Sequence, residues 1–251
     1  MAGSIKKQNG VGVGGKPMFV IGVDEAGRGP VIGPLVICAY AIEGNKEAEL
    51  KKIGVKDSKL LSGENREAIA KKIIHHPHQI AEVSAEEITH YMKRKVSLNE
   101  MEAEKIAGAL LSLSKKLVKS DAESGGPKDG IISTIFVDSP DPTPKKFELR
   151  IRKYLRGTPL EKTQIVSENK ADFKYLCVGA ASILAKSMRE RRVMEIALEV
   201  GDFGTGYPSD GRVIEFLRSH HRDAVLQKYI RHGWATMKAI RSTDLKLKDF
   251  F

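Results

Sequence analysis

The sequence predicts an α/β fold with five strands and flanking helices. Five short runs rich in apolar and β-branched residues have the composition of buried strands, and they lie at 18–24, 31–42, 79–83, 131–137 and 163–166. Helical patterns separate most of these runs, and strands mixed with helices are typical of α/β proteins. A chain of 251 residues can bury a sizeable core in one domain without disulfides.

The first elements are two strands that follow an unstructured segment. Residues 1–16 are rich in Gly and Lys and lack the apolar stretch of a secretory signal, so we expect a disordered basic tail. The strands at 18–24 and 31–42 are joined by a tight turn at 26–30. Because neighbouring strand residues point to opposite faces, Asp24 and Glu25 share one site only if the first strand stops there.

The helices are indicated by capping residues and by apolar residues at helical spacing. Ser62 begins a helix that runs to about residue 75, and a capping sequence at 97–100 begins a longer one to about residue 118. The other helices are expected at 85–92, 145–155, 172–200, 211–221 and 234–241. We divide the chain into a main α/β unit at 17–200, a C-terminal helical portion of the same domain at 201–242, and a tail at 243–251.

Composition excludes some classes of protein and favours others. No apolar run reaches the roughly 18 residues that span a bilayer, so no membrane protein is expected. The two cysteines, Cys38 and Cys177, lie in apolar segments, which suits reduced thiols in a cytoplasmic protein. The net charge of +10 favours a polyanionic partner, although solvated surface lysines account for it equally well.

Four acidic residues stand where metal-dependent chemistry would use them. Asp24 and Glu25 end the first strand, Asp138 ends the fourth, and Asp172 begins a helix. Carboxylates that cluster at strand ends bind hard divalent cations and can hold two ions for phosphoryl displacement. Each acid alone also has an ordinary explanation, since Asp172 suits a helix cap and Asp138 suits the head of a turn.

These acids lie in six ordered motifs that resemble those of type 2 ribonucleases H, the ribonuclease HII family. The residues of the motifs are closer to archaeal and eukaryotic members than to typical bacterial ones. The motifs are GVDEAGRGP at 22–30 with Gly33 and Pro34, DSK at 57–59, VD at 137–138, KADFKY at 170–175, AASILAK at 180–186 and GTGYP at 204–208. They cover the chain from Phe19 to about Ile240. The resemblance implies a ribonuclease H-like fold, with a mixed five-stranded sheet, flanking helices and a C-terminal helical extension.

The resemblance also implies an activity. Members of the family hydrolyse the RNA strand of RNA–DNA hybrids and cut 5′ of ribonucleotides in duplex DNA, leaving 5′-phosphate and 3′-hydroxyl ends. Asp24, Glu25, Asp138 and Asp172 would be the catalytic ligands of Mg²⁺ or Mn²⁺, with two ions in the active site. The implied roles are ribonucleotide excision repair and removal of RNA primers.

Substrate contacts are implied at several of the same motifs. The turn with Gly27, Arg28 and Gly29 resembles the loop whose backbone reads the ribose 2′-hydroxyl. Tyr207 resembles the tyrosine that packs on the next sugar, although alone it suits a turn or core position. Phosphate contacts are expected from Lys59, Ser182 and Lys186, the last two sharing a helix face.

The C-terminal tail resembles a peptide that binds a sliding clamp. Leu247 is followed three residues later by Phe250 and Phe251, while Asp244 stands where such peptides usually have Gln. A short helical turn would place these apolar side chains in a groove of the clamp. The alternative is that the tail packs back on the domain. We expect a monomer otherwise.

Two other functions fit part of the pattern. A resolvase or transposase shares clustered acids on the same architecture, but the Gly27–Arg28–Gly29 turn argues against it. A hybrid-binding module without catalysis has no need of all four carboxylates, and none is missing here.

Overall fold

The computed structural model describes residues 18–55, 62–123 and 131–248. The expected tail at 1–16, Lys59, Phe250 and Phe251 lie outside these residues, and so does the side chain of Leu247.

One mixed sheet forms the centre of the protein, as predicted. Its strands are β1 (Phe19–Ala26), β2 (Leu35–Glu43), β3 (His78–Val83), β4 (Ile132–Asp138) and β5 (Gln164–Glu168). They are arranged in the order β3-β2-β1-β4-β5. β1 is antiparallel to β2 and parallel to β4, while β2 and β3 are antiparallel and β4 and β5 are parallel.

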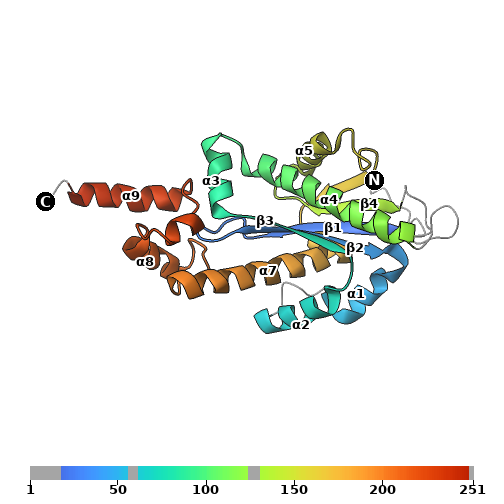
Figure 1. The fold of residues 1–251 in the computed structure, drawn as a ribbon, viewed down its shortest axis with the longest axis horizontal. Helices are drawn as coiled ribbons and strands as arrows, with labels where there is room; N and C mark the ends of the chain where they lie inside the picture. Colours follow the sequence, from blue (N-terminus) through green and yellow to red (C-terminus); the bar gives the residue numbers. More distant parts are fainter. Residues whose placement is uncertain (1–17, 56–61, 124–130, 249–251) are drawn as a thin grey trace.

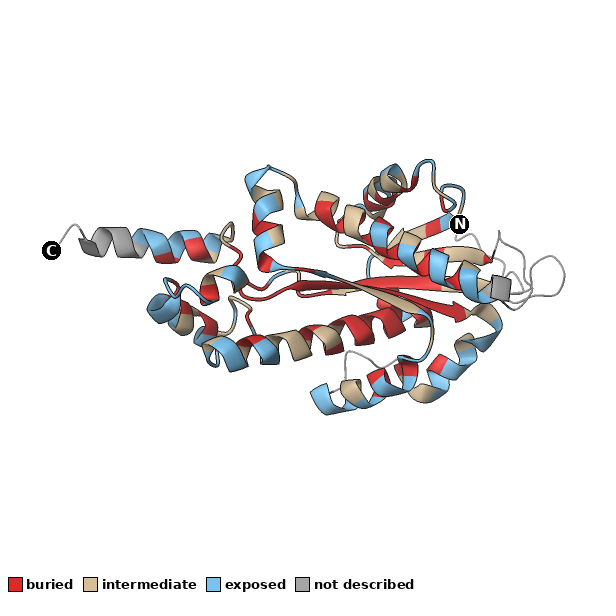
Figure 2. Cartoon of the chain, in the orientation of Figure 1, coloured by how far each residue is buried: buried red, intermediate tan, exposed pale blue. Residues whose placement is uncertain are grey.

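Helices cover both faces of the sheet (Figure 1). One face carries α3 (Ala85–Lys93), α4 (Leu98–Glu123) and α5 (Pro144–Leu155), and the other carries α1 (Glu47–Ile53), α2 (Gly63–Ile73) and α7 (Leu176–Val200). Alternating β1 and β2 residues divide the core, because Ile21, Val23 and Ile37 pack toward α4 whereas Cys38 and Tyr40 pack toward α7. Buried residues accordingly line the sheet and the inner sides of the helices (Figure 2).

The remaining elements lie mostly at the C-terminal end of α7 (Figure 1). They are α8 (Gly211–His220), the 3₁₀ helix η3 (Leu226–Tyr229) and α9 (Ala235–Lys248), while the short η1 (Gly44–Lys46) and α6 (Ala171–Lys174) connect earlier elements. A third apolar cluster joins α8, η3 and α9 to Val31 and Ile32. The C-terminal helices therefore pack against the β1–β2 connection.

Several boundaries differ from the sequence-based expectation. α4 continues past residue 118 to Glu123, and α9 continues past residue 241 to Lys248, so most of the expected tail at 243–251 belongs to this helix. Three further differences concern β1, β2 and the start of α7. β1 does not stop at Asp24 but continues to Ala26, because Ala26 still pairs with Val36 of β2. β2 begins at Leu35, since residues 31–34 leave the sheet and Ile32 forms a bridge with Ile230. The helix expected at 172–200 is broken at Tyr175, whose backbone is extended (φ −116°, ψ 119°).

Cys38 and Cys177 are both buried and free, as predicted for core thiols. Within the described ranges, the apolar length needed to cross a membrane is found in no helix.

Candidate active site

Asp24 and Glu25 lie next to each other near the end of β1 but belong to opposite faces. Asp24 is 5% exposed and faces α7, where it interacts with Ser182 and Lys186. Burial and the charge of Asp138 raise the pKa of Asp24 to about 7. Glu25 faces α4, and burial together with the charges of Glu102 and Asp24 raises its pKa well above the usual value. The two carboxylates therefore reach the same edge of the sheet from opposite faces.

Asp138 and Asp172 join this edge from β4 and α6. The backbone N–H of Ala171 donates a hydrogen bond to Asp138 Oδ1 at 2.7 Å, which ties the start of α6 to the end of β4. Asp172 follows Ala171 and is buried. It is not the helix cap, because Lys170 occupies the N-cap position. Of the four acids, Asp24, Glu25 and Asp138 interact electrostatically, and Asp172 lies beside the group.

The donor set of these residues fits a hard divalent cation. All four side chains offer carboxylate oxygens, which are the ligands that Mg²⁺ and Mn²⁺ prefer. Burial and the negative charge of Asp138 raise the pKa of Asp24, and a bound cation would offset both effects by stabilising the ionised carboxylates. No three His, Cys, Asp or Glu side chains of the described chain already stand in the arrangement of a metal site.

Ser182 and Lys186 share one face of α7, as their spacing predicts. Lys186 Nζ donates to Ser182 Oγ at 2.7 Å, and both side chains interact with Asp24. Ser182 is fully buried, whereas Lys186 lines an open groove. Their direct local role is therefore to hold Asp24 in place, and phosphate contact remains a prediction.

The groove has a volume of about 820 Å³ and contains the predicted sugar-binding residues. Gly27, Arg28 and Gly29 form one wall, and α7 and Tyr207 form others. A Cβ at Gly29 would stand 3.3 Å from Tyr207 Cε1, so the ring lies against the turn. The Arg189 guanidinium carbon lies 4.8 Å from the centre of the same ring. The structure thus places Tyr207 beside the turn at 27–29 and near Glu25.

The turn at 27–29 is held by residues that the sequence analysis did not identify. The Arg28 side chain pairs with the buried Glu102 and donates to Asn99 Oδ1 at 2.6 Å, both on α4. The carbonyl oxygens of the turn accept hydrogen bonds from Arg231 and Trp234. A buried arginine has no periodic signature, so nothing in the sequence pattern indicated these contacts.

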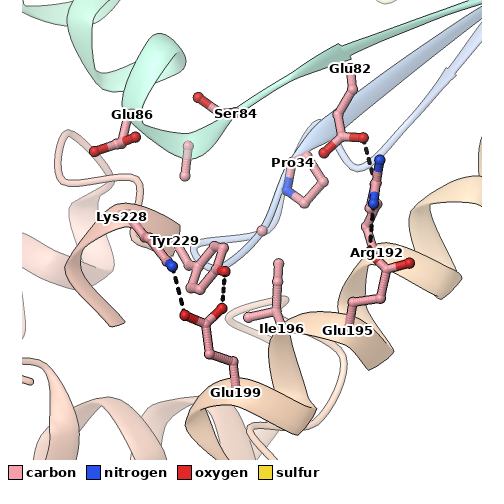
Figure 3. A pocket seen from close by; sticks show the side chains of 12 residues that line it. Pro34, Glu82, Ser84, Glu86, Arg192, Glu195, Ile196, Glu199, Lys228 and Tyr229 are labelled. Atoms are coloured by element: carbon pink, nitrogen blue, oxygen red, sulfur yellow. Dashed lines mark hydrogen bonds and ion pairs between the residues drawn. The ribbon is translucent and has the colours of Figure 1, made fainter. Parts of the chain in front are cut away.

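A second cavity, of about 490 Å³, lies between the start of α3 and the second half of α7 (Figure 3). Most of its charged side chains are paired with one another. Arg192 bonds to Glu82 and Glu195, and Glu199 accepts from Lys228 and Tyr229 (Figure 3). None of the predicted site residues lines this cavity. Tyr229, which lines this cavity, lies just before Arg231 and Trp234, whose side chains bond to the turn at 27–29.

Known proteins match this chain over a range that includes both the groove residues and the four carboxylates. The model of the family described as Ribonuclease HII matches residues 21–237. A ribonuclease HII from Methanocaldococcus jannaschii is 38% identical over 237 residues, covering 92% of this chain and 98% of that protein. The crystal structure of ribonuclease H2 from Pyrococcus horikoshii OT3 matches with a TM-score of 0.74 at 38% identity, covering 90% of this chain and 98% of that chain. A structure of a PCNA:RNase HII complex from Archaeoglobus fulgidus matches with a TM-score of 0.73 at 34% identity, covering 88% and 96%.

Proposed function

The chain belongs to the ribonuclease HII family and is a ribonuclease H-type endonuclease, and we propose that it cuts both RNA in RNA–DNA hybrids and the 5′ side of ribonucleotides in duplex DNA. One observation carries the proposal. A glycine turn and a tyrosine ring line one groove together with Glu25, beside the clustered carboxylates. Such cuts would begin the removal of misincorporated ribonucleotides and of RNA primers.

Enzymes of this family generally use divalent metals. We propose that Asp24, Glu25, Asp138 and Asp172 hold two Mg²⁺ or Mn²⁺ ions, which would supply an activated water and stabilise the leaving 3′ oxygen. Ser182 and Lys186 keep Asp24 oriented toward this site. The N–H of Ala171 does the same for Asp138.

The turn and the ring would read the sugars on either side of the cut. Backbone N–H groups of the turn would bond the 2′-hydroxyl, which deoxyribose lacks. The Tyr207 ring would pack on the following sugar, where an extra hydroxyl would hinder it. Lys186, on the groove wall, and Lys59 would contact the phosphates.

The test is cleavage of a DNA duplex that contains one ribonucleotide, with Mg²⁺ or Mn²⁺. The wild type is expected to cut on the 5′ side of the ribonucleotide. Tyr207→Ala should lower kcat/KM by about tenfold, because it removes the apolar contact between the ring and the sugar, and partial burial of a ring of this size is worth roughly 1.5 kcal/mol. Tyr207→Phe keeps the ring and should stay close to wild type. Intact hybrid binding without cutting in either metal would favour the binding module instead.

We further propose that the tail at 243–251 binds a sliding clamp, since the Archaeoglobus relative is described in complex with PCNA. Replacing Phe250 and Phe251 by Ala should weaken binding to an archaeal clamp by about 30-fold or more, because buried aromatic anchors dominate such interfaces. Cleavage of short duplexes should not change. Asp249→Ala is the matched control in the same tail. Equal clamp affinities for all three proteins, measured by calorimetry, would refute this proposal.

A further inference from the structure

We propose that Arg231, assisted by Trp234, is a positioning residue that aims the backbone N–H groups of the turn at 27–29 into the groove. The proposal deepens the proposed function, on which it rests, by assigning ribonucleotide discrimination to a segment about 200 residues away along the chain.

Arg231 is buried and directs its guanidinium at backbone oxygens. Its side chain is 0% exposed and is one of the largest fully buried in the described chain. Burial lowers its pKa to about 9, which leaves the group charged at neutral pH. The guanidinium donates to three carbonyl oxygens, those of Gly27 (2.6 Å), Arg28 (2.9 Å) and Gly33 (3.0 Å). Hydrogen bonds from a charged donor are stronger than neutral ones, so these carbonyls are firmly oriented.

Orienting the carbonyls also orients the N–H groups. In a planar trans peptide the N–H points opposite to the C=O. The carbonyls of Gly27 and Arg28 point inward at Arg231, so the N–H groups of Arg28 and Gly29 point outward. On that outer side Gly29 is exposed and lines the groove. The turn therefore presents donors where a 2′-hydroxyl oxygen would lie.

Trp234 completes the arrangement at the end of the turn. Its Nε1 donates to the carbonyl of Gly29 at 3.0 Å, which fixes the peptide that joins Gly29 to Pro30. The indole ring also lies 5.0 Å from the Arg231 guanidinium. All three carbonyls of the turn are thus held by two side chains of one short segment.

The segment that carries these side chains is itself anchored. Arg231 N donates to Val31 O at 2.8 Å and Gly33 N donates to Tyr229 O at 2.9 Å, so the segment runs beside the β1–β2 connection. On its other side, Lys228 and Tyr229 both bond to Glu199 of α7 (Figure 3). The segment 228–231 is therefore bound to α7 at its start and to the turn through Arg231.

A purely stabilising role would have a different consequence. Loss of stability alone would reduce binding of DNA and of ribonucleotide-containing DNA together. Misorientation of the N–H groups of the turn would weaken binding only of the substrate that carries a 2′-hydroxyl, because deoxyribose offers no acceptor there. The ratio of the two affinities separates the roles.

The experiment compares Arg231→Met, Arg231→Lys and Trp234→Phe with the wild type on the single-ribonucleotide duplex. It measures kcat, KM and the Ki of an all-DNA duplex of the same sequence as a competitor. Arg231→Met should lower kcat/KM by about 100-fold, as misplacement of a positioned group by about 1 Å does. Its KM should rise toward Ki while Ki stays unchanged. Arg231→Lys keeps the positive charge but not the planar guanidinium with its several donors, so its kcat/KM should lie between those of the wild type and Arg231→Met. Trp234→Phe should lower kcat/KM by roughly 3- to 10-fold.

Met237→Ala is the matched control, because Met237 is buried in the same C-terminal cluster but bonds to none of the turn carbonyls. It should lower Tm without changing the ratio of KM to Ki. An unchanged ratio in Arg231→Met, or in Trp234→Phe if the first variant does not fold, overturns the inference. A wild type that cuts no ribonucleotide-containing duplex refutes the proposed function instead, so the two failures are distinct.

Discussion

Replacing Asp24 by Asn is expected to abolish cleavage while leaving the protein folded and more stable at alkaline pH. Asp24 is buried beside Asp138, and a neutral amide cannot serve as an anionic metal ligand there. The rate should fall by at least about 10³-fold, the upper range for loss of one electrostatic stabiliser. Single-turnover cleavage with Mg²⁺ and with Mn²⁺ measures the loss.

The stability of the same variant follows from the raised pKa. An acid whose pKa rises from 3.8 to about 7 on folding binds its proton more tightly in the folded state. The fold therefore loses stability as the pH rises through this interval, and Asn at position 24 removes that loss. Thermal melts in EDTA at about pH 5 and pH 8 should show a smaller fall in Tm for the variant than for the wild type.

The control is Asp223→Asn, an exposed position where Asn keeps the oxygen that accepts from the N–H groups of Val225 and Leu226. It should change neither activity nor the pH dependence. An Asp24→Asn protein that cuts within about tenfold of wild type would remove Asp24 from the set of ligands.

The positions of most strands and helices could be predicted because apolar spacing reports burial. The same signal does not say what covers an apolar residue. Val31 and Ile32 suited the second strand, yet they pack against the C-terminal helices and leave the sheet. The break at Tyr175 lacks the Gly or Pro that usually marks a helix end. Boundaries therefore failed where tertiary contacts decide them.

The candidate site also contains residues that the sequence could predict and residues that it could not. The proximity of the carboxylates could be predicted because three of them lie at or near strand ends, where chain direction brings them to one edge. Their role as metal ligands stays a prediction. Asp24 and Glu25 meet there without the strand stop that the sequence analysis required, since they approach from opposite faces. Arg231 and Glu102 could not be predicted, because each contacts the turn across a long sequence separation that no local pattern records.

The geometry of the turn makes Gly27 its most sensitive position. Gly27 has φ +88°, where L side chains are strained, and a Cβ there would stand 2.6 Å from Pro34 O and 2.6 Å from Arg189 Cδ. The arginine can shift, but the backbone oxygen belongs to the β1–β2 connection that Arg231 fixes. Gly27→Ala should therefore displace the turn from the Arg231 guanidinium, at a strain of roughly 1–3 kcal/mol.

Displacement of the turn should lower kcat/KM on the single-ribonucleotide duplex by about 100-fold or more and bring KM close to the Ki of all-DNA duplex. Gly29→Ala is the matched control in the same turn, because its Cβ would meet only the Tyr207 ring, at 3.3 Å, without a positive φ. It should lose much less discrimination, since the ring can move by a few tenths of an ångström. Gly108→Ala, with open space around its Cβ in α4, should leave cleavage unchanged. Equal losses of discrimination in Gly27→Ala and Gly29→Ala would contradict this prediction. They would show that crowding of Tyr207, and not the orientation of the N–H groups of the turn, limits recognition of the ribonucleotide.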